Sequence, residues 1–196
     1  MTHDWLLGGR TRLLYGVPGK WLFAALVTAA PGTVGAAGVP PEPQCADSIA
    51  KGMAFLAGSW KGSSYSVAGR DTTEDATMLV ESARLYGGCA LEEKWSAIQG
   101  GKTLFRARVL RAFDAATARW LVYYIDDHLN SQFYEGRHES GQWRFLRTRM
   151  DGATPIQVRL TWSPAGRGYE QMIERSRDGG KTWALAGFVR FRPSHP

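Results

Sequence analysis

The stretch Ile156-Gln-Val-Arg-Leu-Thr-Trp162 alternates apolar and polar side chains without a break. Successive side chains of a β-strand point to opposite faces, so the four apolar residues share one face and the three polar residues share the other. A period of two indicates a half-buried strand rather than a helix. The fold class therefore depends on whether this pattern recurs along the chain.

The same alternation recurs between residues 59 and 192, with turn residues such as Gly87-Gly88 and Asp178-Gly-Gly180 between the alternating segments. Consecutive hairpins form a meander, and closing a meander into a barrel removes its unpaired edge strands. We therefore predict an all-β fold, an antiparallel up-and-down barrel of about ten strands with one short helix at 47–56. A two-sheet sandwich is the alternative. The predicted strands are 59–67, 75–85, 89–98, 102–113, 118–127, 131–138, 142–150, 155–163, 168–176 and 182–192.

The beginning of the chain has the features of an export signal. A basic lead (Arg10, Arg12 and Lys20) precedes an uncharged apolar run at 21–30, and small residues follow at 34–38. This order predicts cleavage after Ala36 or Ala37. The alternative is an uncleaved membrane anchor, because residues 21–39 carry no charge and nearly suffice to span a bilayer.

The predicted organisation is a signal peptide at 1–37, a Pro-rich linker at 38–46 and one barrel domain at 47–196. The mature protein is then secreted or periplasmic, with no membrane association after cleavage. Its two cysteines, Cys45 and Cys89, both lie beyond the signal. In an oxidising compartment an even pair favours a disulfide, and the alternative is two separate buried thiols.

The charge of the chain excludes some classes of function. The 196 residues carry 24 basic and 18 acidic side chains, a net charge of +6. Without residues 1–37, which hold three basic residues and one acidic residue, the balance is 21 against 17, or +4. These charges are scattered, so no nucleic-acid partner is expected. The sequence also lacks a Gly-x-Ser-x-Gly elbow, a phosphate loop and a dinucleotide fingerprint, so it predicts no catalytic nucleophile.

Three segments of the sequence resemble a known superfamily. The segment Phe55-Leu-Ala-Gly-Ser-Trp60-Lys-Gly62 resembles the opening strand of the calycins, the lipocalin and fatty-acid-binding barrels. The segments 87–95 and 176–183 are similar to a bacterial lipocalin-like branch without an assigned function. The resemblance covers about 50–193. It implies a barrel in which Trp60 closes one end and Arg190, or else Arg192, lies across its ring, but it does not identify the contents of the lumen.

The resemblance also bears on cofactors, because some lipocalin-like barrels bind haem through a histidine of a late strand. No late strand predicted here contains a histidine, and His138 at the end of the sixth strand is the best remaining candidate. We expect no haem and no other cofactor. We also expect no metal, because no two histidines have ligand spacing and the two cysteines are far apart.

Candidate binding residues are charged and aromatic side chains that share strand faces. Arg147 shares a face with Trp143, and Tyr124 shares one with Asp126. If the arginine face points inward, its guanidinium group can bind a carboxylate or phosphate beside aromatic side chains that hold an apolar body. The alternative is that this face points outward. The predicted ligand-binding residues are Glu93, Trp95, Tyr124, Asp126, Tyr134, Trp143 and Arg147.

These observations leave three hypotheses for function. The first is an exported barrel that binds a small hydrophobic or amphipathic molecule in its lumen, with an anionic head as one option. The second is a barrel enzyme that uses an inward Asp, Glu or Tyr as acid–base. In Glu92-Glu93 and Asp126-Asp127 adjacent strand residues point to opposite faces, so neither pair can act together. The third is an envelope structural or interaction module whose lumen is filled by side chains.

Overall fold

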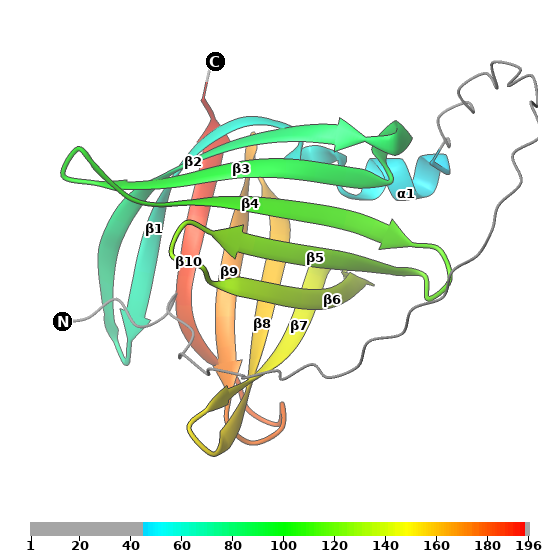
Figure 1. The fold of residues 1–196 in the computed structure, drawn as a ribbon. Coiled ribbons are helices and arrows are strands. Elements are labelled where there is room, and N and C mark those ends of the chain that lie inside the picture. Colours follow the sequence, from blue (N-terminus) through cyan, green and yellow to red (C-terminus); the bar gives the residue numbers. More distant parts are fainter. Residues whose placement is uncertain (1–44, 195–196) are drawn as a thin grey trace, which may run out of the picture. The chain divides into compact units, whose positions relative to one another are not determined.

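The computed structural model of the protein describes residues 45–194 (Figure 1). The predicted signal peptide at 1–37 and residues 38–44 of the predicted linker lie outside the described residues. Two short helical segments, α1 (Asp47–Gly52) and η1 (Ala54–Leu56), precede the strands, and the 3-10 turn η2 (Tyr86–Gly88) follows the second strand. The strands are β1 (Gly58–Ala68), β2 (Asp71–Leu85), β3 (Ala90–Gln99), β4 (Lys102–Asp114), β5 (Arg119–Asp126), β6 (Ser131–Glu139), β7 (Gln142–Asp151), β8 (Thr154–Ala165), β9 (Gly168–Ser176) and β10 (Ala184–Pro193).

The ten strands form one closed antiparallel barrel. Each strand pairs with its neighbours in the chain, and β1 closes the barrel against β10. The closing register runs from Trp60 opposite Pro193 to Ser66 opposite Gly187. The prediction of an antiparallel up-and-down barrel is confirmed, and the two-sheet alternative is excluded.

One end of the barrel, the helix end, is the end against which α1 and η1 lie. The indole nitrogen of Trp60 donates a hydrogen bond of 2.9 Å to the carbonyl oxygen of Leu56 in η1. The Phe55 ring meets Tyr169 at the start of β9, with 6.0 Å between ring centroids. Gly52 of α1 lies against the indole of Trp143 on β7. A Cβ atom added to Gly52 would be 2.6 Å from Cζ2 of Trp143. The helical segments therefore cover aromatic side chains at this end.

The interior near the helix end is filled by aromatic side chains. Phe145, Trp162 and Trp120 have exposed fractions of 0%, 1% and 2%. Phe145 and Trp162 pack edge-to-face with 5.1 Å between centroids, a geometry that aromatic pairs prefer. Burial of such large apolar surfaces is the main force that stabilises the barrel.

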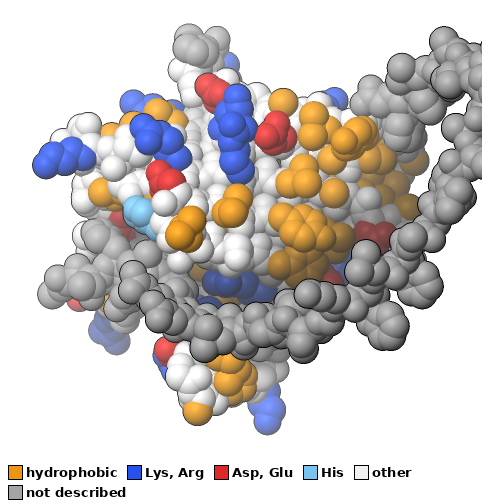
Figure 2. Space-filling model, in the orientation of Figure 1, with side chains coloured by type: hydrophobic (Ala, Val, Ile, Leu, Met, Phe, Trp, Pro, Cys, Tyr) orange, Lys and Arg blue, Asp and Glu red, His pale blue; other side chains and the backbone are white. Residues whose placement is uncertain are grey.

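Strand β5 carries apolar side chains on both faces. Trp120 and Val122 point inward and are buried, whereas Tyr123 and Ile125 point outward with exposed fractions of 47% and 54%. Tyr123 also packs against the outward Phe133 of β6, with 4.9 Å between centroids. Figure 2 shows apolar side chains gathered on this outer face of the barrel. The sequence of β5 alone therefore does not distinguish its inner face from its outer face.

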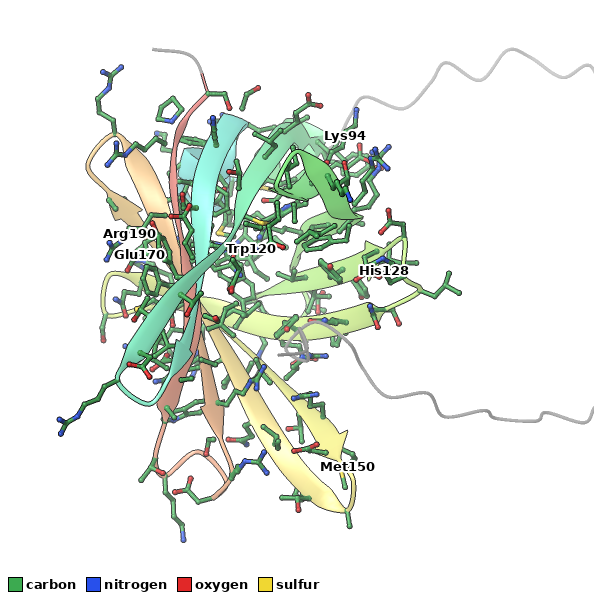
Figure 3. The ribbon with its side chains drawn as sticks, turned by 90° about the vertical axis from the view of Figure 1, so that its left-hand side faces the viewer. Lys94, Trp120, His128, Met150, Glu170 and Arg190 are labelled. Carbon is green, nitrogen blue, oxygen red and sulfur yellow. A yellow bond between two sulfur atoms is a disulfide. The ribbon has the colours of Figure 1, made fainter. Side chains whose placement is uncertain are left out.

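The barrel wall opens between β6 and β7. These strands pair only from Glu135 opposite Leu146 to Glu139 opposite Gln142. The first residues of β6, 131–134, and the last residues of β7, 147–151, have no partner across this boundary. Figure 1 shows β6 and β7 diverging. In Figure 3 the β5–β6 turn at His128 and, below it, the β7–β8 hairpin at Met150 are separate from each other. We call this gap the β6–β7 opening.

Candidate functional site

A buried ion pair lies inside the barrel at the helix end. Arg111 of β4 and Glu93 of β3 have side chains that are 1% exposed. Arg111 Nε donates to Glu93 Oε1 at 2.8 Å, and Nη2 donates to Oε2 at 3.1 Å. Trp95 Nε1 donates to Glu93 Oε2 at 2.8 Å. The guanidinium carbon of Arg111 lies 4.3 Å from the ring centroid of Trp162.

This network accounts for two of the predicted ligand-binding residues, Glu93 and Trp95. Both oxygens of Glu93 are occupied within the protein, so its carboxylate is neutralised by Arg111 rather than held ready for a ligand. Trp143 also belongs to this end, because its ring packs edge-to-face on Trp120 at 6.1 Å and is 9% exposed. All three residues therefore pack the interior. Sequence reasoning missed Arg111, although its inward direction follows from the alternation of Ala107, Val109 and Arg111.

Asp126 closes the turn between β5 and β6. Its Oδ1 accepts hydrogen bonds from the backbone N–H groups of His128 (3.0 Å) and Asn130 (2.9 Å). Its Oδ2 accepts from the Tyr124 hydroxyl at 3.0 Å and from the Asn130 amide at 3.0 Å. Burial raises the pKa of the Tyr124 hydroxyl, and the Asp126 charge raises it further, so Tyr124 stays protonated at neutral pH. These contacts favour a structural role for Asp126 over acid–base chemistry.

Three arginines face the interior at the end opposite α1, which we call the arginine end. Arg147 of β7 and Arg175 of β9 are both opposite Val158 of β8 in the register, so the three residues form one cross-strand row. Arg149 is opposite Ile156 in the next inward row. Val158 and Ile156 are 4% and 0% exposed, which shows that this face of the sheet is the inner one. The arginine-bearing face of β7 therefore points into the barrel.

The arginine cluster (Arg147, Arg149 and Arg175) is not paired with carboxylates, although the nearby charge of Asp151 acts to raise the pKa of Arg175. Within residues 45–194, none of the three forms an ion pair. Burial lowers the pKa of the Arg147 guanidinium, and the nearby charge of Arg149 lowers it further. The pKa of Arg175 is lowered by burial, by Arg149 and by other arginines around it. The protein thus holds several like charges together in a partly desolvated place.

A cavity of about 580 Å³ lies at the β6–β7 opening, beside Arg147. Most of its lining faces outward: Phe133 and Leu146 form its apolar wall with exposed fractions of 41% and 48%, and Ser131 and Thr148 are also exposed. Gln132 and Arg147 belong to the inward-facing rows of β6 and β7, so the cavity extends from the outer surface into the opening. The Tyr134 hydroxyl donates to Gln132 Oε1 at 2.6 Å. The guanidinium carbon of Arg147 lies 5.0 Å from the centroid of the Tyr134 ring. Two predicted binding residues, Tyr134 and Arg147, are therefore brought together at a cavity.

Arg190 does not lie where the sequence analysis placed it. Its guanidinium is on the outer surface, where Nε donates to Glu170 at 2.8 Å and the side chain is 68% exposed (Figure 3). In the closing register Arg190 is opposite Ser63, whereas Trp60 is opposite Pro193. The structure thus differs from the predicted packing of Arg190 across Trp60, because Val189 and Phe191 take the inward positions of β10. The neighbour of Trp60 is Tyr169, with 5.0 Å between ring centroids.

The disulfide predicted between Cys45 and Cys89 is confirmed. The two Cα atoms are 5.1 Å apart, and the bond joins the start of the described chain to the turn between β2 and β3. Disulfides persist in oxidising environments, which for most proteins means outside the cytoplasm. No helix within residues 45–194 has the length and apolar content needed to cross a bilayer.

His138, the candidate haem ligand, lies on β6 near the helix end. Its side chain is exposed, and its ring is 5.0 Å from the ring of Trp143. In the described part of the chain, no three His, Cys, Asp or Glu side chains come together as a metal site would require. These residues therefore offer no arrangement on which a cofactor proposal can be built.

Comparison with known proteins does not assign the chain to a family. No family model matches its sequence, and no curated protein matches it. The function is consequently argued from the geometry of the barrel, and above all from the cavity at the β6–β7 opening and the arginine cluster beside it.

Proposed function

We propose that the protein binds a small amphipathic molecule at the arginine end of the barrel, with access through the β6–β7 opening. The observation that carries the proposal is the cavity of about 580 Å³ at this opening. Pockets for small ligands occupy roughly 300–1,000 Å³ and combine apolar walls with a few polar groups. The volume of the cavity falls in this range. Phe133 and Leu146 supply an apolar wall, and the other seven lining residues are polar or charged, which suits a ligand with a polar head.

The opening itself supports binding rather than a solely structural role. A closed barrel is stabilised by continuous backbone pairing. Residues 131–134 of β6 and 147–151 of β7 have no partner across this boundary, so their backbone groups on this side lack a neighbouring strand. The same two strands pair nearer the helix end, from Glu135 opposite Leu146 to Glu139 opposite Gln142. A gap in the wall, beside a cavity, is a route by which a ligand can reach the interior.

We further propose that the protein is an exported member of the calycin superfamily. The basic-apolar-small order of residues 1–37 supports export, and the disulfide fits the oxidising compartment that export would provide. The Gly58-x-Trp60 segment at the start of β1, in a closed antiparallel barrel, supports the superfamily assignment. Secretion and location in the periplasm are both compatible with these features.

The test is the binding of a neutral amphipathic dye, Nile red, to the purified protein, followed by the increase of its fluorescence. Thr148→Trp places a large ring at the cavity lining and should abolish the increase. Thr103→Trp is the matched control, because Thr103 is an exposed strand threonine of β4 outside the cavity lining. It should leave dye binding unchanged. Equal binding to the wild type and Thr148→Trp would refute the proposed location.

A further inference from the structure

The arginine cluster is placed by the register of three adjacent strands rather than by a flexible loop. Arg147 and Arg175 lie two strands apart in one inward row, with Val158 between them. Arg149 lies two residues along β7 from Arg147, on the same face. The charges of all three arginines act to lower the pKa of Tyr134, against the larger opposing effect of its burial. The guanidinium carbon of Arg147 lies 5.0 Å from the centroid of the Tyr134 ring, and the register places Arg149 and Arg175 on the same inward face.

Two other arginines of the barrel are paired with carboxylates. Arg159 of β8 points outward and forms two hydrogen bonds with Glu174 of β9, at 2.7 and 2.8 Å. Deep in the barrel, Arg111 is paired with Glu93 in the same bidentate way. The arginine cluster differs from both, because no ion pair involves it among the described residues. Its partner must therefore come from solvent or from a ligand.

Arg147 also carries a donor that the protein leaves unused. Its Nε is buried and has no hydrogen-bond partner in the described structure. A buried donor without an acceptor destabilises the folded state, and more so when it belongs to a charged group. Because Arg147 lines the cavity at the β6–β7 opening, an acceptor in that cavity is the simplest way to satisfy it.

We infer that the amphipathic molecule carries a dianionic phosphate-type head, bound by Arg147 with Arg149 and Arg175; this inference rests on the proposed function. Guanidinium groups are planar forks that bind phosphate oxygens through paired hydrogen bonds. A monocarboxylate would neutralise one of three cations, whereas a phosphate monoester neutralises two and offers three oxygens. Phe133 and Leu146 supply apolar surface for the remainder of the molecule.

Isothermal titration calorimetry of the full-length protein with four probes tests this inference. Decyl phosphate, decyl sulfate, decanoate and decanol share one apolar chain and differ in head group. Decyl phosphate should bind at least about tenfold more tightly than the two monoanions, and decanol should bind most weakly. Inorganic phosphate alone should bind far more weakly than decyl phosphate, because it lacks the apolar body.

Arg147→Gln should weaken the binding of decyl phosphate about 10- to 100-fold and leave decanol unaffected, because only the head group meets the guanidinium. Arg108→Gln removes the same charge from the outer surface, where Arg108 is 58% exposed and paired with Glu92. This control should retain the affinity for decyl phosphate. An equal loss in the two variants would reduce the effect to general electrostatic attraction and overturn the inference.

The outcomes also separate the inference from the proposed function. Equal affinities for decyl phosphate and decanol would overturn the arginine site and leave the binding of an amphipathic molecule intact. Equal affinities for decyl phosphate and inorganic phosphate would contradict the amphipathic ligand and leave the arginine cluster as an anion site. Absence of binding by all five compounds would contradict both.

Discussion

Arg111 and Arg147 both extend inward from strands of one barrel, and their surroundings differ. Arg111, near the helix end, is bonded twice to Glu93 and lies over the Trp162 ring. Arg147, at the arginine end, has no ion-pair partner among the described residues and lies beside a cavity. Each arginine has one buried nitrogen without a hydrogen-bond partner, Nη1 of Arg111 and Nε of Arg147. The difference is that Glu93 neutralises the charge of Arg111, whereas no carboxylate among the described residues forms an ion pair with Arg147. Under the proposed function, the helix end contributes stability and the arginine end binds the ligand.

The largest expected effect is a loss in the free energy of unfolding when the buried ion pair of Glu93 and Arg111 is broken. Glu93→Gln leaves the buried Arg111 charge without compensation, and loss of one partner of a buried ion pair typically costs about 3–5 kcal/mol. Denaturant unfolding followed by tryptophan fluorescence measures the free energy of unfolding. Glu92→Gln is the adjacent control, because Glu92 pairs with the exposed Arg108 and such surface pairs contribute less than about 1 kcal/mol. Equal losses in the two variants would contradict the structural role of the helix-end pair.

The second effect concerns the disulfide. Replacing Cys45 and Cys89 together by serine removes a cross-link over a sequence separation of 44 residues. The loop-entropy argument gives a loss of roughly 4 kcal/mol in the free energy of unfolding. Dye binding at the β6–β7 opening should persist at temperatures where the variant remains folded. A folded variant that no longer binds the dye would show that the two regions are not independent.

A smaller, pH-dependent effect on stability is expected at the β9–β10 hairpin, which lies at the arginine end. Asp178 accepts hydrogen bonds from the Thr182 hydroxyl (2.6 Å) and backbone N–H (2.9 Å) and from the Ser176 hydroxyl (2.7 Å). These bonds, the Thr182 hydroxyl first, lower the pKa of Asp178 to about 2 from an ordinary value of 3.8. A lowered pKa in the folded state means that the contribution to stability is complete above the ordinary value. It is lost as the pH falls toward 2.

NMR titration of the Asp178 carboxyl carbon and the Thr182 amide measures this directly. Both signals should titrate together near pH 2, and Asp178→Asn should remove the transition from the Thr182 amide. A transition near pH 4 would show that the hairpin bonds do not hold the carboxylate in its ionised form.

Much of the fold could be predicted from the sequence because period-two alternation and turn residues are local signals. The pattern at Ile156–Trp162 and the turns at Asp151-Gly152 and Asp178-Gly-Gly180 place strands without tertiary information. The disulfide followed from the cysteine count, since a single pair has one possible connection. The predicted position of Arg190 across Trp60 came from the resemblance alone. The alternation of Val189, Arg190 and Phe191 does not by itself show which residues of β10 face the lumen, and in the structure Val189 and Phe191 do.

The candidate site was harder to predict because it depends on the register between strands. The pair of Glu93 with Arg111 joins β3 to β4, and nothing local links the two residues. Arg175 was overlooked for the same reason, since it meets Arg147 only through the common partner Val158 on β8. The gap in pairing between β6 and β7 also has no local sequence signal. Alternation showed that the arginines share a face, and only the closed barrel showed that this face is the inner one.

The free energy of unfolding of Arg147→Gln, measured by denaturant unfolding without ligand, tests the central claim most directly. The lowered pKa of Arg147 means that its charge is less favoured in the folded state than in the unfolded state. Removal of that charge should therefore leave the stability unchanged or raise it, while the affinity for decyl phosphate falls. A loss of stability as large as that of Glu93→Gln would contradict the account. Arg147 would then be a structural residue like Arg111, and the arginine end would not be a binding site.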